Sequence, residues 1–196
     1  MKKLTIVIPN REGESPDVTI RSLYRQDFKD FDIIIINDRE GNANTARNAG
    51  FEFVKTPYVL FSDNDIVWNE PAINLMIQTL EANPEISYAY GSYYFENHSA
   101  PIQCTEEFNA DLLRKRNFIS TMSVIRSVHF PGFDPEIRRF QDWDLWLTML
   151  EQGHTGKNIG TVAFTTNVRR GITYSGLFST TDALRAIQGK HNLQLV

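Results

Sequence analysis

Two aspartates separated by a single residue stand directly after an apolar segment, in "YVLFSDND". In an extended chain, residues i and i+2 point to the same side, so Asp63 and Asp65 can direct both carboxylates to one point. Such hard oxygen donors suit Mg²⁺ or Mn²⁺, which takes its remaining ligands from water and substrate phosphates. The spacing therefore indicates a metal site for a phosphate-bearing substrate. The alternative is that Asp63 caps a turn and Asp65 is solvated.

A site of this kind needs a strand to hold it, and the sequence predicts one. Residues 58–62 are apolar and end at the aspartates, and the apolar segments 4–9 and 31–38 predict two further strands. Strands that are apolar on both faces belong to parallel sheets covered by helices, and ligands bind beyond the carboxyl ends of such strands. The two aspartates therefore lie where a ligand is expected.

Helices are expected between these strands. Helical patterns at 17–27, 44–54 and about 69–82, and a further strand at 85–95, give an alternating strand–helix order. This order predicts an α/β fold with a mainly parallel central sheet and helices on both faces. The second half is less regular, and its clearest element is a helix from about Asp142 to Gln152.

Composition limits the class of protein. The chain has 196 residues, 41% of them hydrophobic, which is enough for one domain with a core. Its net charge of −4 gives no electrostatic reason to expect nucleic-acid binding. Cys104 is the only cysteine, which excludes intramolecular disulfides and cysteine-rich zinc sites. The sequence has no apolar segment as long as a membrane helix or signal peptide, so we expect a soluble cytoplasmic protein.

Four segments carry a family resemblance. They read, in chain order, "LTIVIPNREG", "TIRSLYRQDFKDFDIIIIND", "TARNAGFEFVKTPYVLFSDND" and "FPGFDPEIRRFQDWDLWLTMLEQGH". In order and spacing they resemble a family-2 glycosyltransferase with the GT-A fold, from Leu4 to about His154. The resemblance implies a Rossmann-like sandwich formed by a single domain, residues 1–196. The donor half would be residues 1–95, and residues 96–196 the acceptor half with a C-terminal lid and helix.

The resemblance also implies an activity and a donor site. Such enzymes transfer a sugar from a nucleotide diphosphate to an acceptor hydroxyl, with inversion at the anomeric carbon. Asp38 would accept a hydrogen bond from the base, which suits the N3–H of uracil and hence a UDP-sugar. Asn10 and Arg11 would pack the base and ribose, and Arg47 would face the nucleotide. The alternatives are a turn aspartate, a solvated loop arginine and a surface helix arginine.

The family's Asp-x-Asp motif matches residues 63–65. By resemblance, Asp63 contacts the ribose and a water on the metal, Asp65 binds the Mn²⁺ or Mg²⁺ directly, and Asn64 belongs to the nucleotide site. Asp142 matches the catalytic base, although Gln141 stands where the family typically has glutamate. Without the resemblance Asp142 reads as a helix cap, and the neighbouring Asp144 is a second acidic residue in the same first turn.

Several expectations remain about substrates and alternatives. The sequence lacks the Gln-x-x-Arg-Trp motif of processive synthases, which favours single-sugar transfer, and residues 169–176 resemble a lid. The acceptor is open: a glycan, a lipid-linked molecule or a protein. The oligomeric state is also open. The competing interpretations are a metal-dependent nucleotidyltransferase on a similar sheet and a degenerate transferase module without catalysis.

Overall fold

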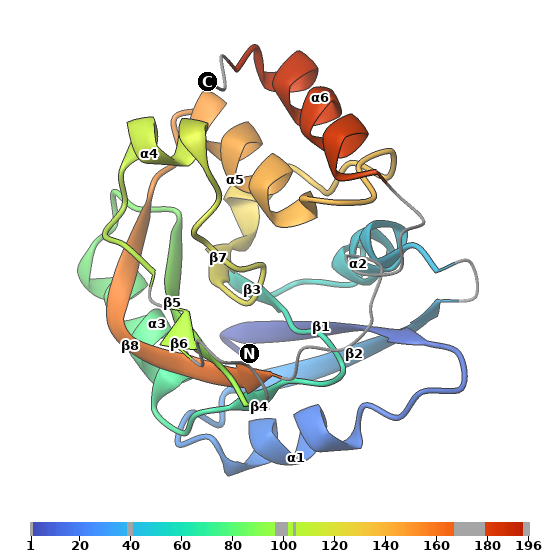
Figure 1. Ribbon diagram of the computed structural model, residues 1–196. Coiled ribbons are helices and arrows are strands. Elements are labelled where there is room, and N and C mark those ends of the chain that lie inside the picture. The colour runs from blue at the N-terminus through green and yellow to red at the C-terminus, as the bar shows by residue number, and fades with distance from the viewer. Residues whose placement is uncertain (1, 39–40, 97–101, 104, 167–178, 194–196) are drawn as a thin grey trace.

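A single curved sheet with helices on both sides forms the protein (Figure 1). The structure is a computed structural model that describes residues 2–38, 41–96, 102–103, 105–166 and 179–193. The lid expected at residues 169–176 lies outside the described residues. In the orientation of Figure 1, α1 lies below the sheet, whereas α4, α5 and α6 lie above it.

The first half alternates strands and helices as the hydrophobic pattern predicts. Its elements are β1 (Leu4–Arg11), α1 (Asp17–Arg25), β2 (Phe31–Asp38), α2 (Ala43–Phe51), β3 (Tyr58–Phe61), β4 (Val67–Trp68), α3 (Ala72–Ala82) and β5 (Tyr88–Phe95). The two-residue strand β4 is the one element of this half that the sequence did not predict, because a strand that short carries no periodicity.

The second half is built from shorter pieces around one long strand. Its elements are β6 (Ile102–Gln103), α4 (Ala110–Lys115), β7 (Val124–Arg126), the 3₁₀ helix η1 (Ser127–His129), α5 (Gln141–Glu151), β8 (Gly156–Thr166) and α6 (Thr180–His191). The helix expected from about Asp142 is confirmed as α5, which begins one residue earlier.

The strands follow the order β2-β1-β3-β7-β5-β8-β4, and β6 pairs with β5. β1 runs parallel to β2 and β3, and β5 runs parallel to β8. β7 is antiparallel to β3 and β5, and β4 is antiparallel to β8. Most paired residues lie in parallel pairings, so the expected α/β fold with a mainly parallel sheet is confirmed.

Alternating side chains of the strands fill two cores. Leu4, Ile6 and Ile8 of β1 face a core that includes buried residues of α1 and α3. Val7, between them, faces the opposite core, which includes buried residues of α4, α5 and α6. Because both faces of the sheet are covered at β1 and β3, these two strands are largely apolar, as the sequence indicated. The edge strand β2 is less buried than its sequence predicted, and Ile35 is 40% exposed.

Gly50 lets α2 lie close to the sheet. A Cβ atom at this position would meet Val7 Cγ1 at 2.4 Å, far inside the normal contact distance. A glycine is therefore required if α2 is to keep its present distance from β1.

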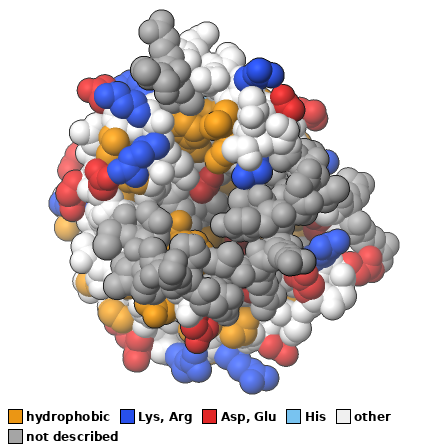
Figure 2. Space-filling view, in the orientation of Figure 1, with side chains coloured by type: hydrophobic (Ala, Val, Ile, Leu, Met, Phe, Trp, Pro, Cys, Tyr) orange, Lys and Arg blue, Asp and Glu red, His pale blue; other side chains and the backbone are white. Residues whose placement is uncertain are grey.

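No helix among the described residues is long and apolar enough to cross a bilayer. On the face shown in Figure 2, acidic and basic side chains of the described residues are interspersed rather than separated by sign.

Candidate active site

Polar side chains gather beyond the carboxyl ends of β1, β2 and β3. Asn10 pairs in register with Asn37, and its Nδ2 donates to Asn37 Oδ1 at 3.0 Å. Asn64, after β3, donates through Nδ2 to Asn10 Oδ1 at 2.8 Å and to Glu14 Oε2 at 2.9 Å. The ends of three neighbouring strands are thus joined by amide side chains, as expected for parallel strands that end at one edge.

The predicted nucleotide residues Arg11 and Asp38 lie at this same edge. They face each other in register at the ends of β1 and β2. Arg11 is exposed and Asp38 is half-buried. The backbone N–H of Glu12 donates to the carbonyl oxygen of Asp38 at 3.2 Å, which extends the pairing of the two strands by one residue.

The turn that carries the Asp-x-Asp motif is fixed from below by α1. Thr19, fully buried, donates through Oγ1 to the carbonyl of Asp63 at 3.1 Å and accepts from the N–H of Ile66 at 2.9 Å. Asp63, Asn64 and Asp65 are all half-buried. The turn is held through its backbone, which leaves part of each carboxylate at the surface.

Arg47 of α2 is the buried cation of the site, with 4% of its surface exposed. Its Nη2 donates to Asp63 Oδ1 at 2.7 Å. Its Nη1 donates to Asn44 Oδ1 and to Gln141 Oε1, both at 3.3 Å. The guanidinium carbon lies 5.1 Å from the centre of the Phe133 ring. Arg47 therefore joins the end of β3 to the beginning of α5, which excludes the interpretation as a surface arginine.

The loop before α5 is held against α2 by two asparagines. Asn44 Nδ2 donates to the carbonyls of Asp134 and Ile137 at 2.8 and 3.0 Å. Asn48 Nδ2 donates to the carbonyl of Phe133 at 2.7 Å, and its Oδ1 accepts from the N–H of Phe133 at 2.8 Å. These contacts fix residues 133–137 and so the point at which α5 begins.

Phe140 precedes α5 in a left-handed backbone conformation, with φ 61° and ψ 34°. A non-glycine residue in this region costs on the order of 1–3 kcal/mol, and such residues cluster at functional sites. The conformation turns the chain directly into Gln141 and Asp142, the first two residues of the helix.

Asp142 is half-buried and its carboxylate is poorly solvated. Burial raises the pKa of Asp142, and this effect outweighs the opposing contributions of the Trp143 N–H, the positive charge of Arg47 and the Asn117 side chain. The Trp143 N–H donates to Asp142 Oδ1 at 2.9 Å. A carboxylate with a raised pKa can accept a proton, as a general base must.

Asp144 lies on another side of α5, in what we call the α5–α6 cluster: Asp144, Glu151, Lys190 and His191. Asp144 Oδ1 contacts Lys190 Nζ and His191 Nε2, each at 2.8 Å. His191 Nδ1 lies 2.8 Å from Glu151 Oε1. Asp144 is buried and engaged with α6, so the structure separates it from Asp142 and gives it a structural role.

Titration of the α5–α6 cluster follows from its geometry. Burial opposes protonation of His191, but the hydrogen bonds and charges of Asp144 and Glu151 outweigh it, so the pKa of His191 is raised. Lys190 also contacts Asp134 Oδ2 at 2.7 Å, and this hydrogen bond lowers the pKa of Asp134. The protonated histidine therefore stabilises the contact between the two helices.

The donor set fits a divalent cation held partly by substrate. Among the described residues, no group of three or more histidine, cysteine, aspartate or glutamate side chains forms a metal cluster. Asp63 and Asp65 supply two carboxylates, and Arg47 already contacts one oxygen of Asp63. Mg²⁺ is commonly bound by one or two carboxylates and completed by phosphate and water, so two carboxylates at the strand end suffice.

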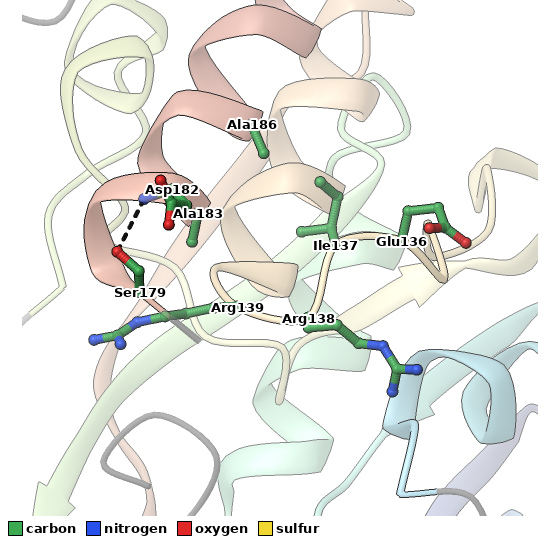
Figure 3. Close-up of a pocket in the computed structure, with 8 residues that line it drawn as sticks. All are labelled: Glu136, Ile137, Arg138, Arg139, Ser179, Asp182, Ala183 and Ala186. Atoms are coloured by element: carbon green, nitrogen blue, oxygen red, sulfur yellow. Dashed lines mark hydrogen bonds between the residues drawn. The ribbon is translucent and has the colours of Figure 1, made fainter. Parts of the chain in front are cut away.

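A cavity of about 320 Å³ adjoins the start of α5 (Figure 3). Residues 136–139 line one side and the first turns of α6 line the other. Figure 3 shows Arg139 directed toward Ser179 at the start of α6, whereas Arg138 extends the opposite way. Arg138 Nη1 lies 3.4 Å from the carbonyl oxygen of Gly41.

The comparisons with known proteins agree with this architecture. A curated relative, an uncharacterized glycosyltransferase of Haemophilus influenzae, is 24% identical over 185 residues, which cover 76% of this chain and 62% of the relative. S. aureus TarS 1–349 in complex with UDP has a TM-score of 0.70 at 14% identity, covering 99% of this chain and 67% of that chain. Its complex with UDP-GlcNAc gives 0.71 at 13% identity, covering 99% and 68%.

These structural matches define the fold as the GT-A type that the sequence predicted. The family model of glycosyl transferase family 2 matches residues 24–133, more than half of the chain. The chain belongs to glycosyl transferase family 2. It spans less than two thirds of the length of the Haemophilus influenzae relative.

Proposed function

We propose that this protein is a metal-dependent, inverting glycosyltransferase that moves one sugar from a UDP-sugar to an acceptor hydroxyl. The observation that carries the proposal is the position of Arg47, which contacts Asp63 at the end of β3 and Gln141 at the start of α5. Because one guanidinium spans both elements, the donor-side aspartates and Asp142 belong to one site. Family membership supports the reaction class.

The donor would bind across the ends of β1, β2 and β3. The half-buried carboxylate of Asp38 can accept the N3–H of uracil, and Arg11 can pack beside the base or reach a phosphate. Asn10 and Asn64, which are hydrogen-bonded to each other, would line the ribose side. The solved complexes of S. aureus TarS 1–349 contain UDP and UDP-GlcNAc, which supports a uridine donor here.

Asp65, with Asp63, would hold Mn²⁺ or Mg²⁺ against the diphosphate. When bound, the ion would offset negative charge on the diphosphate and help to position it. Arg47 would keep Asp63 in place through the 2.7 Å contact, so that the turn does not have to reorganise when the donor binds.

Asp142 would act as the general base. Its carboxylate takes the proton of the acceptor hydroxyl, and the oxygen then attacks the anomeric carbon from the face opposite the diphosphate. The bond from the anomeric carbon to the phosphate oxygen breaks, and its electron pair leaves with UDP. A single displacement of this kind inverts the anomeric centre.

The acceptor would approach from the side of α5 and α6. The cavity combines an apolar surface from Ile137, Ala183 and Ala186 with charged and polar groups from the rest of its lining, which are Glu136, Arg138, Arg139, Ser179 and Asp182. A mixed lining of this kind suits a hydroxyl-bearing acceptor. A glycan, a lipid-linked molecule and a protein all fit this description.

Binding measurements test the donor assignment. We expect calorimetry with Mn²⁺ to show tighter binding of UDP than of GDP or CDP. The N3–H of uracil can donate to Asp38, whereas N3 of cytosine carries no hydrogen. Incubation with UDP-GlcNAc should release UDP slowly, with water as acceptor. Tighter binding of CDP would remove Asp38 from this role, and tighter binding of GDP would contradict the uridine donor. Release of pyrophosphate from UTP in place of UDP release would indicate a nucleotidyltransferase, and no nucleotide binding would indicate a degenerate module.

A further inference from the structure

We propose that Gln141 is a positioning residue whose uncharged side chain holds one arm of Arg47 without neutralising it. The positive charge of Arg47 then acts on Asp63 and Asp142 together. This inference rests on the proposed function, because Asp142 is the base only in that proposal. The geometry on which it stands is independent of any substrate.

The two arms of the Arg47 guanidinium have different partners. Nη2 forms a charged contact of 2.7 Å with Asp63, whereas Nη1 donates to the amide oxygens of Asn44 and Gln141 at 3.3 Å. The Nη1 arm is therefore held by neutral amides, and the Nη2 arm by a carboxylate. The ion pair with Asp63 keeps the guanidinium at the donor side, and the amide contacts set its orientation toward α5.

The surroundings of Asp142 make the charge of Arg47 important. Its carboxylate receives the Trp143 N–H and lies near the neutral Asn117 side chain, and within the part of the chain that the structure describes Arg47 is the cation that acts on it. Asp144, the nearest acidic residue along the chain, is engaged with Lys190 and His191 of α6. Arg47 therefore counters the cost of ionising a poorly solvated base.

A carboxylate at position 141 would change this balance. Asp63, Asp142 and Arg47 carry formal charges of −1, −1 and +1, and a glutamate in place of Gln141 would add another −1 on the same guanidinium. The added carboxylate would compete with Asp63 for Arg47 and repel the ionised form of Asp142. The amide oxygen of glutamine keeps the hydrogen bond and avoids both effects.

The experiment compares Gln141→Glu with Gln152→Glu, which makes the same chemical change at an exposed residue after the other end of α5. We expect Gln141→Glu to raise the acid limb of the pH profile of UDP-GlcNAc hydrolysis by about one unit. The ¹³C carboxyl titration of Asp142, followed by NMR in the protein without ligands, should move by a similar amount. Gln152→Glu should leave both unchanged.

A third variant separates charge from orientation. Gln141→Met removes the hydrogen bond without adding charge, so it should lower kcat about tenfold, leave the KM for donor nearly unchanged and leave the acid limb in place. A merely structural role would lower thermal stability in both variants without moving the profile. The inference is overturned if Asp142 titrates alike in Gln141→Glu and wild type, or, should that variant not fold, if Gln141→Met keeps wild-type kcat.

The NMR titration also separates two kinds of failure. If wild-type protein neither binds UDP nor hydrolyses UDP-GlcNAc, the proposed function fails. The response of Asp142 to Gln141→Glu still decides whether Gln141 protects the charge of Arg47.

Discussion

Two clusters of polar and charged side chains lie at α5, and they differ in whether the buried charge is positive or negative. In the Arg47 cluster, formed by Arg47, Asp63 and Gln141, the cation is buried and 39% of the Asp63 side chain remains exposed. In the α5–α6 cluster the acid is buried, with 4% of the Asp144 side chain exposed, and Lys190 and His191 surround it. One cluster presents a carboxylate to the surface, and the other encloses one.

This contrast explains how two aspartates in one helical turn acquire different roles. Asp142 and Asp144 are both at the N-terminus of α5, where carboxylates are favoured by unpaired N–H groups. The Asp144 carboxylate forms salt bridges with Lys190 and His191. Burial raises the pKa of Asp142, and among the described residues Arg47 is the charged group that opposes this effect. The surroundings, rather than the helix position, therefore distinguish the two carboxylates.

The largest expected effect separates these two aspartates. Asp142→Asn should lower transfer or hydrolysis by a factor on the order of 10²–10⁴, the usual range for loss of a general base. Donor binding should stay nearly the same, because in the proposed function this carboxylate acts on the acceptor and does not contact the nucleotide. Asparagine caps a helix about as well as aspartate, so stability should change little.

Asp144→Asn is the matched control. It should cost about 3 kcal/mol of unfolding free energy, because Lys190 and His191 lose their buried partner. Its activity should survive at temperatures at which the protein stays folded. Kinetics and urea denaturation on both variants check the comparison. Loss of activity in Asp144→Asn, with Asp142→Asn active, would reverse the assignment.

The next largest effect is the metal dependence of UDP binding, which should involve the donor site and not the α5–α6 cluster. Asp65→Ala should weaken UDP binding by about tenfold or more in Mn²⁺ and leave the residual affinity insensitive to a chelator. The α5–α6 cluster contains no proposed metal ligand, so chelation should not alter the melting temperature of the unliganded protein. Calorimetry and thermal denaturation with and without a chelator measure both. Equal UDP affinity with and without the metal would contradict the proposed metal site.

The smallest expected effect is a pH dependence of stability. The pKa of His191 is raised above its ordinary value of 6.5 in the folded state. Its stabilising contribution is therefore fully present below pH 6.5 and is lost as pH rises through the raised pKa. His191→Gln should remove the part of the decrease in unfolding free energy that comes from His191, a difference on the order of 1 kcal/mol. Urea denaturation across this window measures it, and parallel pH profiles of the two proteins would contradict it.

The pattern of the first half predicted the fold because most local signals agreed with the final structure. Apolar strands such as residues 58–61 are buried between two layers of helices. Residues 31–38 were expected to be equally buried, but β2 is an edge strand and Ile35 is 40% exposed. The pattern did not predict β4 or the antiparallel β7, because both are short and are defined by their partners rather than by periodicity. Long-range pairing of this kind leaves little local signal.

The sequence predicted several residues that the structure brings together, but not how they contact one another. Asn10, Asp63 and Asn64 do gather at one edge, and Arg47 contacts Asp63 there rather than lying on the surface. Their roles with a ligand stay predictions. Asn37, Asn44 and Thr19 were missed, because an asparagine at a strand end or in the first turn of a helix, or a buried threonine, looks like ordinary turn and core chemistry. Only its three-dimensional partners distinguish such a residue.

Gly50 has no functional group, but it helps to determine the geometry of the candidate site. It lies one turn after Arg47, and its missing Cβ lets α2 rest on Val7 of β1. Any larger residue at position 50 would push α2 away from β1. The guanidinium of Arg47, on the same helix, would then move away from Asp63. In evolutionary terms, substitution at position 50 is restricted, because the face of α2 that packs against β1 leaves no space for a side chain there. A survey confined to polar residues would overlook this position.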